Sequence, residues 1–541
     1  MKKIINKVIL IASCILFIFL ALGATMVFIP GVNILGVKYV RSTSGSVYDI
    51  KQKYAPEGSF SSVDIVADNI PIKLNFVQSY NYTVELNERF NGFSKYTETP
   101  KLTMEVVDGA LKFYAKEYKP FIYHNRLDEY GLIISIPVYY LGKVSVTSQT
   151  SKITVGGLTG QLDTLSLNTK GLITIEDSFS ANNLEIVSGS KWIKINENCK
   201  IANNLTIKTT NGSAEVFAPI GGEINFTSNS GKLFFNLCNS LKVTCKTGGV
   251  EPLDKSEGKV NTTADISCNG STVIYSAQSV TAKTKNGDFS FGQSGLINNS
   301  KLDVETKSGN IKLLGEFKAE DVSLKTNSGD IAIQKIDTIK INTKHGKVKL
   351  NSVETAEINA GSSGVEILKA TNNVTVSTRS GYVKLGTSGA DFNASATIST
   401  LGGDVKIISG DGKSYDITTK SGKVQITNCY DNISEYKITS KSGSISLQGI
   451  NGKSDIQTSG EVSLSVHEFN GEVSVNAKNK KVEAVVEDEA IYYLQSKGKK
   501  VSVPAKNEKV EIYNTTIGAT DTKNLLTVKT HKGKITISEK F

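Results

Sequence analysis

Apolar and polar residues alternate in short runs along most of the chain, and a polar phrase ending in glycine separates one run from the next. The phrase "VSLKTNSGDIAI" occupies Val322–Ile333 and returns further along as "VTVSTRSGYVKL" and "YDITTKSGKVQI". Each copy contains an apolar strand of period two, a turn and a second short strand. In the regular middle the turn glycines recur about every 17 to 22 residues, which is a period typical of solenoids. The pattern therefore predicts an all-β repeat protein.

Two architectures fit this repeat. In a hairpin array the glycine turn reverses the chain, whereas in a parallel β-solenoid it makes a corner and each strand pairs with its equivalent one repeat later. Stacking at about 4.8 Å selects one residue type at one register, and a hydroxyl residue stands three positions before the glycine in nearly every copy. These residues are Thr284, Thr306, Thr326, Thr343, Thr378, Thr400, Thr419 and Ser440, and Gly361 is the exception. The column favours a solenoid with about two strands per rung.

The glycine is expected to provide a positive φ at the corner, because other residues adopt that conformation only at a cost in free energy. Roughly 20 rungs would form a rod on the order of 95 Å long. Both ends of such a rod need covering, because they expose unpaired backbone groups.

Three parts are expected along the chain. Residues 1–37 form a cytoplasmic tip and a transmembrane anchor, and residues 38–143 form an irregular, aromatic-rich antiparallel β region that caps the solenoid. Within it, "VDGALKF" predicts a hairpin around Asp108 and Gly109. The solenoid occupies 144–541, with atypical, charged C-terminal rungs from about residue 476.

The anchor is predicted from the uncharged segment Val8–Pro30, which as a helix is long enough to cross a hydrocarbon core of about 30 Å. Lys2, Lys3 and Lys7 precede it, so the N-terminus should be cytoplasmic and the bulk of this single-pass protein extracytoplasmic. Cleavage after Gly23 would instead release a secreted protein, and both alternatives stay open.

Charge and cysteine usage narrow the function classes. The 541 residues have a formal net charge of +10, but lysines and acids are interspersed, which does not indicate a nucleic-acid partner.

Cys14 lies in the apolar segment, and the other cysteines are Cys199, Cys238, Cys245, Cys268 and Cys429. Cys245 and Cys268 fall at nearly the same point of neighbouring repeats and could stack or bridge. The favoured interpretation is buried thiols in small apolar sites.

No catalytic, metal-binding or cofactor-binding residue is predicted. His124, His345, His467 and His531 are far apart and lack metal-ligand spacing, and no nucleophile or phosphate-loop motif is present. An alternative is a polysaccharide-processing β-helix enzyme, which needs clustered carboxylates. The residues after the glycine are Asp288, Asn310, Asp330, Lys347, Val365, Tyr382, Asp404, Lys423 and Ser444. Acids alternate with other types there, which suits charge balance better than catalysis or calcium binding.

Basic residues recur two positions before the glycine and are expected along one edge of the solenoid. The basic stripe consists of Lys285, Lys307, Lys344, Arg379, Lys420 and Lys441, interrupted by Asn327, Ser362 and Leu401. Such a stripe could hold an anionic cell-wall polymer or lipid headgroups through many weak contacts. Alternatively, the lysines only prevent solenoids from joining side by side.

The segment "ISIPVYYLGKVSVTSQTSKITVGGL", together with "TNSGDIAI" and "TKSGNIKL", resembles the bacterial putative-adhesin β-strand-repeat family. The likeness runs from about Val63 onward, although Lys152 stands where the first repeat usually has glycine. It implies an envelope β-solenoid with no settled activity. The resulting hypothesis is a membrane-anchored, extracytoplasmic, adhesin-like structural or binding protein that is not an enzyme. A sensor or scaffold that meets an envelope protein in a membrane complex is a further alternative.

Overall fold

The structure is a computed structural model of the whole chain, which divides into two compact units, Met1–Cys238 and Asn239–Phe541. The residues that it describes are 9–19, 31–34, 37–41, 48–95, 102–116, 123–126, 131–157, 160–176, 178–254, 258–293, 295–388, 392–408, 412–427, 435–467, 471–487, 493–497, 500–502, 516–517 and 525–540.

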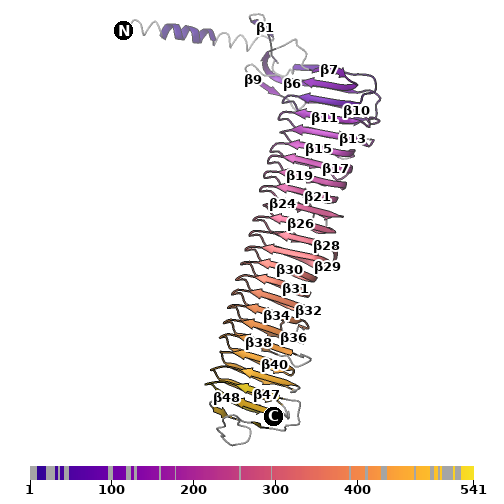
Figure 1. Cartoon of the computed structure of the whole chain (residues 1–541). Helices are drawn as coiled ribbons and strands as arrows, with labels where there is room; N and C mark the ends of the chain where they lie inside the picture. The colour runs from indigo at the N-terminus through magenta and orange to yellow at the C-terminus, as the bar shows by residue number, and fades with distance from the viewer. Residues whose placement is uncertain are drawn as a thin grey trace. The chain divides into compact units, whose positions relative to one another are not determined.

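The first unit contains a regular stack of parallel strands (Figure 1). Its long strands are β13 (Leu162–Thr169), β15 (Ser180–Ser188), β17 (Lys200–Thr209) and β19 (Ile220–Ser228). Its short strands are β14 (Ile173–Ile175), β16 (Ile193–Ile195), β18 (Ala214–Val216) and β20 (Leu233–Phe235). Each strand pairs in parallel with its equivalent in the next rung, as Leu165 with Leu184 and Leu184 with Leu205.

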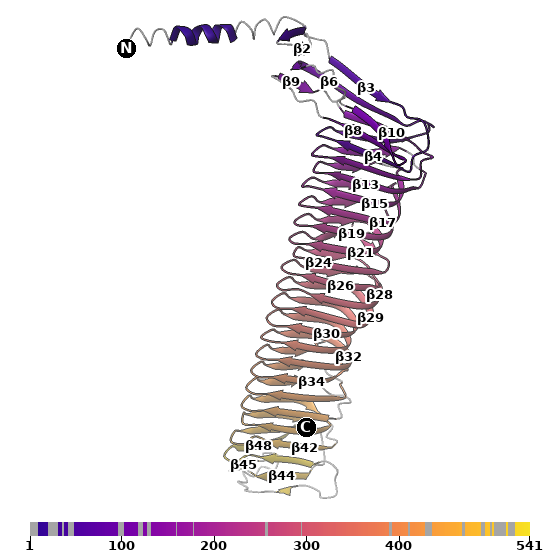
Figure 2. The ribbon, with the colours of Figure 1, turned by 45° about the horizontal axis from the view of Figure 1, so that its top comes forward.

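The second unit repeats this arrangement, with long strands before the corner and short strands after it (Figure 2). Long strands are β24 (Thr263–Cys268), β26 (Ser279–Thr284), β28 (Leu296–Glu305), β34 (Ser395–Thr400), β36 (Ser414–Thr419), β38 (Glu435–Ser440), β40 (Lys453–Thr458) and β42 (Glu472–Asn476). Short strands are β22 (Val250–Pro252), β25 (Thr272–Ile274), β27 (Phe289–Phe291), β33 (Val383–Leu385), β35 (Val405–Ile408), β37 (Val424–Thr427), β39 (Ile445–Ile450), β41 (Val462–Val466) and β43 (Val482–Glu487). Between them, β29 (Ile311–Thr326), β30 (Ile331–Thr343), β31 (Val348–Ala360) and β32 (Val365–Thr378) each join a short strand to the next long one.

The core is the narrow interior of each coil. Alternate residues point inward, so Val348, Leu350 and Ile358 of β31 are buried while Lys349 and Glu357 between them are exposed. Burying these apolar side chains is the main favourable contribution to folding. The predicted all-β fold with a parallel solenoid is therefore confirmed, and the hairpin-array alternative is wrong for the repeats.

The corner glycines are required for a different reason from the one expected. Positive φ values occur at other glycines, whereas Gly329 and Gly403 are not among them. A Cβ atom on Gly329 would lie 1.8 Å from the carbonyl oxygen of Gly309 one rung away, and one on Gly403 would lie 1.8 Å from that of Gly381. The glycines therefore allow consecutive corners to stack backbone on backbone, and the positive-φ explanation is wrong.

The hydroxyl column is buried and in register, as predicted. Thr378 pairs with Thr400 and Thr400 with Thr419. These side chains also bridge the corner: the amide of Gly422 donates to Thr419 Oγ1 at 3.0 Å, and that of Gly403 donates to Thr400 Oγ1 at 2.8 Å. The threonines thus fill their sites and bond to the glycine three residues later: some accept from its amide, as Thr400 does, and others donate to its carbonyl oxygen, as Thr378 does at 2.8 Å.

One rung departs from this pattern, and the placement of Gly361 in the hydroxyl column was wrong by one position. Ala360, rather than Gly361, pairs with Thr343 and Thr378 in the hydroxyl column. Ser363 consequently occupies the glycine position, where it is buried and its Oγ has no hydrogen-bond partner. This rung therefore lacks both the threonine bridge and the corner glycine.

The start of the first unit is part parallel and part antiparallel. The predicted hairpin is confirmed as β7 (Leu102–Val107) and β8 (Ala110–Ala115), with φ values of 52° at Asp108 and 77° at Gly109. Other strands here are β1 (Gly31–Ile34), β2 (Val37–Arg41), β3 (Tyr48–Tyr54), β6 (Thr83–Lys95), β9 (Tyr123–Arg126) and β10 (Gly131–Pro137). Strand β6 is antiparallel to β2, β3, β9 and β10.

Parallel coiling begins before the repeats become visible in the sequence. Strands β4 (Ser62–Ala67) and β5 (Ile72–Val77) pair in parallel with β11 (Lys143–Ser148) and β12 (Ile153–Gly157). On their other side they pair in parallel with β8 and β10. The expected antiparallel region is therefore present around β6, but it is joined by parallel strands, because one early rung lies between two rungs that come later in the chain.

The end of the second unit has the same kind of insertion. Strands β47 (Leu525–Lys529) and β48 (Lys534–Lys540) pair on one side with β42 and β43. On the other side they pair with β44 (Tyr493–Lys497) and β45 (Lys500–Ser502). A short strand, β46 (Thr516–Ile517), is antiparallel to β44. The last rung in sequence is thus not the outermost rung of the stack.

The N-terminal segment contains a helix over residues 9–19 whose side chains are exposed. In the part of the chain that the structure describes, no helix has the length and apolar character needed to cross a membrane. The remainder of the predicted anchor and the cleavage position after Gly23 lie outside the described residues. The boundaries at 37/38 and 143/144 stay predictions.

Candidate functional site in the basic corner of the second unit

The corner between the long and short strands presents the basic stripe on a rigid backbone. Serines next to the stripe fix the turn: Ser442 Oγ donates to the carbonyl oxygen of Lys420 at 3.2 Å, and Ser362 Oγ donates to that of Lys344 at 3.3 Å. With the threonine–glycine bond on the inside and the serine–carbonyl bond on the outside, the turn is held on both faces. The Thr-Lys-Ser-Gly phrase thus fixes the backbone position from which the lysine side chain projects.

All six stripe residues lie in one column of successive rungs. The amide of Lys307 donates to the carbonyl oxygen of Lys285 at 3.1 Å, and the amide of Arg379 donates to that of Gly361 at 2.7 Å. The column is Lys285, Lys307, Asn327, Lys344, Gly361, Arg379, Leu401, Lys420 and Lys441, so Gly361 replaces Ser362 as the interruption. Four of its bases, Lys307, Lys344, Arg379 and Lys420, recur every second rung, which is about 9.6 Å.

The stripe is not neutralised by ion pairs. The six side chains are exposed, and none of them forms an ion pair within the described residues. Some lysines on the strands are paired instead: Lys325 pairs with Glu305 at 2.8 Å, and Lys340 with Glu357 at 2.9 Å. The stripe therefore presents cations to solvent.

The acids next to the stripe have a structural role that the sequence did not reveal. Asp288 Oδ1 accepts a hydrogen bond from the amide of Asn310, Asp330 Oδ1 from that of Lys347, and Asp404 Oδ1 from that of Lys423, each at 2.8 Å. Each carboxylate thereby pairs with a backbone N–H of the next rung. We call this column the acid ladder. Among the described residues, the ladder carboxylates form no ion pair with the stripe, so charge balance is not their observed role. In the irregular rung the ladder position is occupied by Gly364 rather than Val365.

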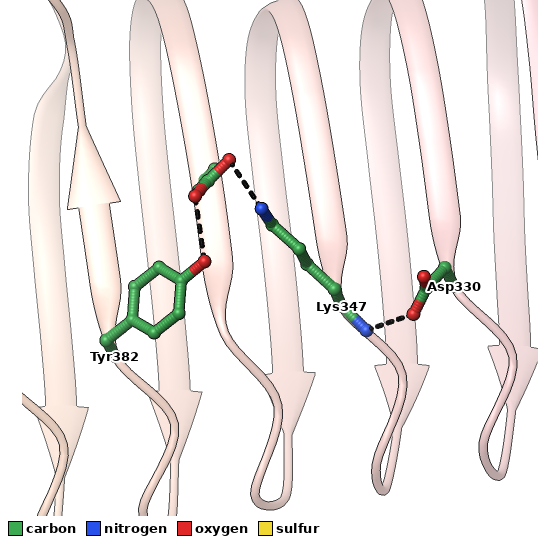
Figure 3. Close-up of polar contacts among 4 residues, drawn as sticks. Asp330, Lys347 and Tyr382 are labelled. Atoms are coloured by element: carbon green, nitrogen blue, oxygen red, sulfur yellow. Dashed lines mark hydrogen bonds and ion pairs between the residues drawn. The ribbon is translucent and has the colours of Figure 1, made fainter.

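Three residues form a clasp across the rungs beside the ladder (Figure 3). Glu366 lies between Lys347, whose Nζ is 3.0 Å from Glu366 Oε2, and Tyr382, whose hydroxyl donates to Oε1 at 2.7 Å. Desolvation alone would raise the pKa of Glu366, but the hydrogen bonds from Tyr382 and Lys347 hold that pKa below its ordinary value. Desolvation and the hydrogen bond to Glu366 raise the pKa of Tyr382. The clasp therefore contains an ionised glutamate and a protonated tyrosine at neutral pH.

A second basic row, missed from the sequence, follows the short strands. Lys349 pairs in register with Glu366, Glu366 with Lys384, and Lys384 with Lys406. Lys312 lies in the same column, and together with Lys349 it lines a shallow groove of about 240 Å³. The signal was available in "IKL", "VKL" and "VKI", where lysine is the outward residue of a short apolar strand. The face beside the corner is thus basic along two lines.

The remaining candidate residues carry no evident chemistry. No group of three histidine, cysteine, aspartate or glutamate residues is placed to hold a metal ion anywhere in the described ranges. His345 is exposed, with Nδ1 2.8 Å from Ser362 Oγ. Cys429 and the His124 side chain lie outside what the structure describes.

The favoured interpretation of the cysteines as buried thiols is confirmed for four of them. Cys199, Cys238, Cys245 and Cys268 are buried and not oxidised to disulfides. Burial raises the pKa of Cys238 to about 12, so this thiol stays protonated and unreactive. Cys245 and Cys268 therefore do not bridge.

Comparison with known proteins places the chain near a family of β-strand repeats. The family model described as Toastrack DUF4097 matches residues 272–414 and 395–538. This match supports the predicted resemblance to an adhesin-like β-repeat family. It does not establish that the phrase in "TNSGDIAI" is that family's repeat. No curated protein matches the chain.

One similar solved structure is the crystal structure of a putative adhesin from Parabacteroides merdae ATCC 43184. It shares 12% sequence identity, and the alignment covers 70% of this chain and 98% of that chain with a TM-score of 0.14. At that TM-score the likeness carries no argument about this protein.

Proposed function

We propose that the protein is a non-catalytic, adhesin-like binding protein of the cell envelope that holds an anionic polymer along its basic corner. The polymer would contact Lys285, Lys307, Lys344, Arg379, Lys420 and Lys441, each contact being weak and the row together giving useful avidity. The N-terminal segment would anchor the protein in the membrane with the solenoid outside.

The observation that carries the proposal is the separation of charges at the corner. The stripe bases are exposed and form no ion pair with any residue that the structure describes, while carboxylates of the acid ladder accept hydrogen bonds from backbone amides. A row that served only to balance neighbouring acids would be expected to pair with them. An anionic polymer lying along the corner would supply the missing counter-charges.

Retention on an immobilised polyanion tests the proposal. Replacing all six stripe residues by glutamine should abolish retention at low salt, and retention of the unaltered protein should fall as salt rises. The matched control replaces Lys283, Lys301, Lys318, Lys325, Lys340 and Lys437 on the long strands, which are also exposed, and leaves the stripe intact. If both variants lose retention equally, net charge rather than the stripe is responsible and the proposal fails.

The anchor has its own test. Membrane fractionation should recover the full-length protein with the membrane, and sequencing of its N-terminus should find the segment Val8–Pro30 still attached. Recovery of a shortened protein in the medium, beginning near Ala24, would contradict an anchor and show secretion instead.

A further inference from the structure

We propose that Tyr382 is a stacking platform for a sugar ring, so that the polymer held at the basic corner is an anionic polysaccharide. This inference rests on the proposed function and goes beyond it by naming the ligand's chemistry. The stripe alone would accept any polyanion, including one without rings. An aromatic ring fixed among cations adds a requirement for a flat, apolar surface on the ligand.

The ring of Tyr382 is held in place before any ligand arrives. Its hydroxyl donates to Glu366, which Lys347 holds from the other side (Figure 3). A Cβ atom on Gly364 would lie 2.4 Å from Tyr382 Cε1, so the ring occupies space that any other residue at 364 would fill. Tyr382 nevertheless remains 41% exposed. A ring supported from below and tethered at its tip loses little conformational entropy on binding.

The position of Tyr382 among the charges indicates the ligand class. It lies in the same turn as Arg379 of the stripe and two residues before Lys384 of the second row. In the second unit the other described positions of its column include Ser271, Asp288, Asn310, Asp330, Lys347, Gly364, Asp404, Lys423 and Ser444, none of them aromatic, whereas the first unit has Trp192 at the equivalent position. The pyranose ring of an acidic sugar offers C–H groups that pack on an aromatic face. The carboxylate of that sugar would be within reach of the Arg379 guanidinium or the Lys384 ammonium group.

Two soluble polymers distinguish a sugar platform from simple charge binding. Hyaluronan has a carboxylate on alternate sugars, whereas inorganic polyphosphate has charge but no rings. Tyr382→Ala should weaken binding to hyaluronan roughly tenfold and leave binding to polyphosphate unchanged. Tyr382→Phe, which keeps the ring and loses the tether, should weaken hyaluronan binding by only about twofold.

The outcomes separate this inference from the proposed function. Loss of both polymers when the six stripe residues become glutamine, together with a hyaluronan-selective loss in Tyr382→Ala, supports both. If Tyr382→Ala leaves hyaluronan binding unchanged, or weakens both polymers equally, the platform is overturned while the stripe stands. If the unaltered protein binds polyphosphate and not hyaluronan, the sugar inference also fails. Binding of neither polymer would overturn the proposed function and the platform with it.

Discussion

The same corner occurs in both units, but its outward column differs. In the first unit the column is Asp68, Gln149, Lys170, Gly189, Thr210 and Asn229, with one base and one acid in six. In the second unit the nine positions from Lys285 to Lys441 include six bases and no acid. The inner residues are shared: the amide of Gly212 donates to Thr209 Oγ1 at 2.8 Å, just as that of Gly422 donates to Thr419 Oγ1 at 3.0 Å. Folding therefore depends on the shared inner positions of the repeat, and recognition is free to vary outside them.

The largest loss of stability is expected when a corner glycine, one of the shared inner residues, is changed. A Cβ atom on Gly403 would collide with the Gly381 carbonyl oxygen, whereas one on the adjacent Gly402 would meet nothing closer than 3.7 Å. Gly403→Ala should therefore lower the free energy of unfolding by about 3 kcal/mol. Gly402→Ala should change it by less than about 1 kcal/mol. Urea unfolding followed by circular dichroism measures both, and equal effects would contradict backbone stacking at the corner.

Repairing the irregular rung should be the next largest effect. Ala360 lacks the hydroxyl found in its column, and Ser363 has a buried oxygen without a partner. The double variant Ala360→Thr, Ser363→Gly should restore the bridge and remove the unpaired group, raising stability by about 2 kcal/mol. The neighbouring rung provides the opposite change. Thr343→Ala deletes the bond that Thr343 Oγ1 accepts from the amide of Gly346, and it should lower the free energy of unfolding by about 1 kcal/mol. A double variant no more stable than the parent in urea would show that this rung is built differently.

Moving charge into the first unit sharpens the comparison. Replacing Gln149, Thr210 and Asn229 by lysine extends the column around Lys170 and should strengthen retention on a polyanion about fivefold, since exposed charges contribute a few tenths of a kcal/mol each. The control places lysines at Asn168, Val187 and Thr227, which are exposed on the long strands. The two variants have the same net charge. Equal retention of both would argue that charge matters and the corner does not.

The smallest effect concerns the clasp. Desolvation and the hydrogen bond to Glu366 both raise the pKa of Tyr382, so Glu366→Gln, which removes the second cause, should lower that pKa towards the ordinary value of about 10. A raised folded-state pKa adds stability below the unfolded pKa, and this stability is lost as pH rises through the folded value. Alkaline titration of tyrosinate absorbance, with Tyr382→Phe subtracted, measures the shift. An unchanged titration would show that the hydroxyl is not held by Glu366.

The lowered pKa of Glu366 makes stability depend on pH in the opposite direction. Its contribution to stability is present above the unfolded pKa of about 4.3 and is lost as pH falls through the lower folded value. The clasp should therefore loosen in acid, and Glu366→Gln should remove this pH dependence.

Much of the fold could be predicted because stacking repeats one local environment many times. The threonine column and the stripe are visible in the sequence, since every rung applies the same selection to the same position. The role of the glycines was misassigned because a close approach between backbones leaves the same signature as a positive φ. The acid ladder and the clasp of Lys347, Glu366 and Tyr382 depend on side-chain contacts between rungs, which the sequence pattern does not specify.

The end rungs could not be predicted for a related reason. Strand β47 inserts between β42 and β44, and such an order depends on long-range pairing that local alternation does not encode. The second basic row was predictable in principle, because lysine recurs at the outward position of several short strands, with Ala332 and Glu366 as interruptions.

The central claim is that successive coils align equivalent residues, so that the bases form one straight row. Spin labels on Lys307→Cys and Lys420→Cys test it, with Cys14 and Cys429 replaced by serine and the four buried cysteines left in place. Six rungs separate the two positions, so electron–electron dipolar spectroscopy should give a narrow distance distribution near roughly 29 Å. A broad distribution, or one centred well beyond about 40 Å, would contradict in-register stacking and the binding row that depends on it.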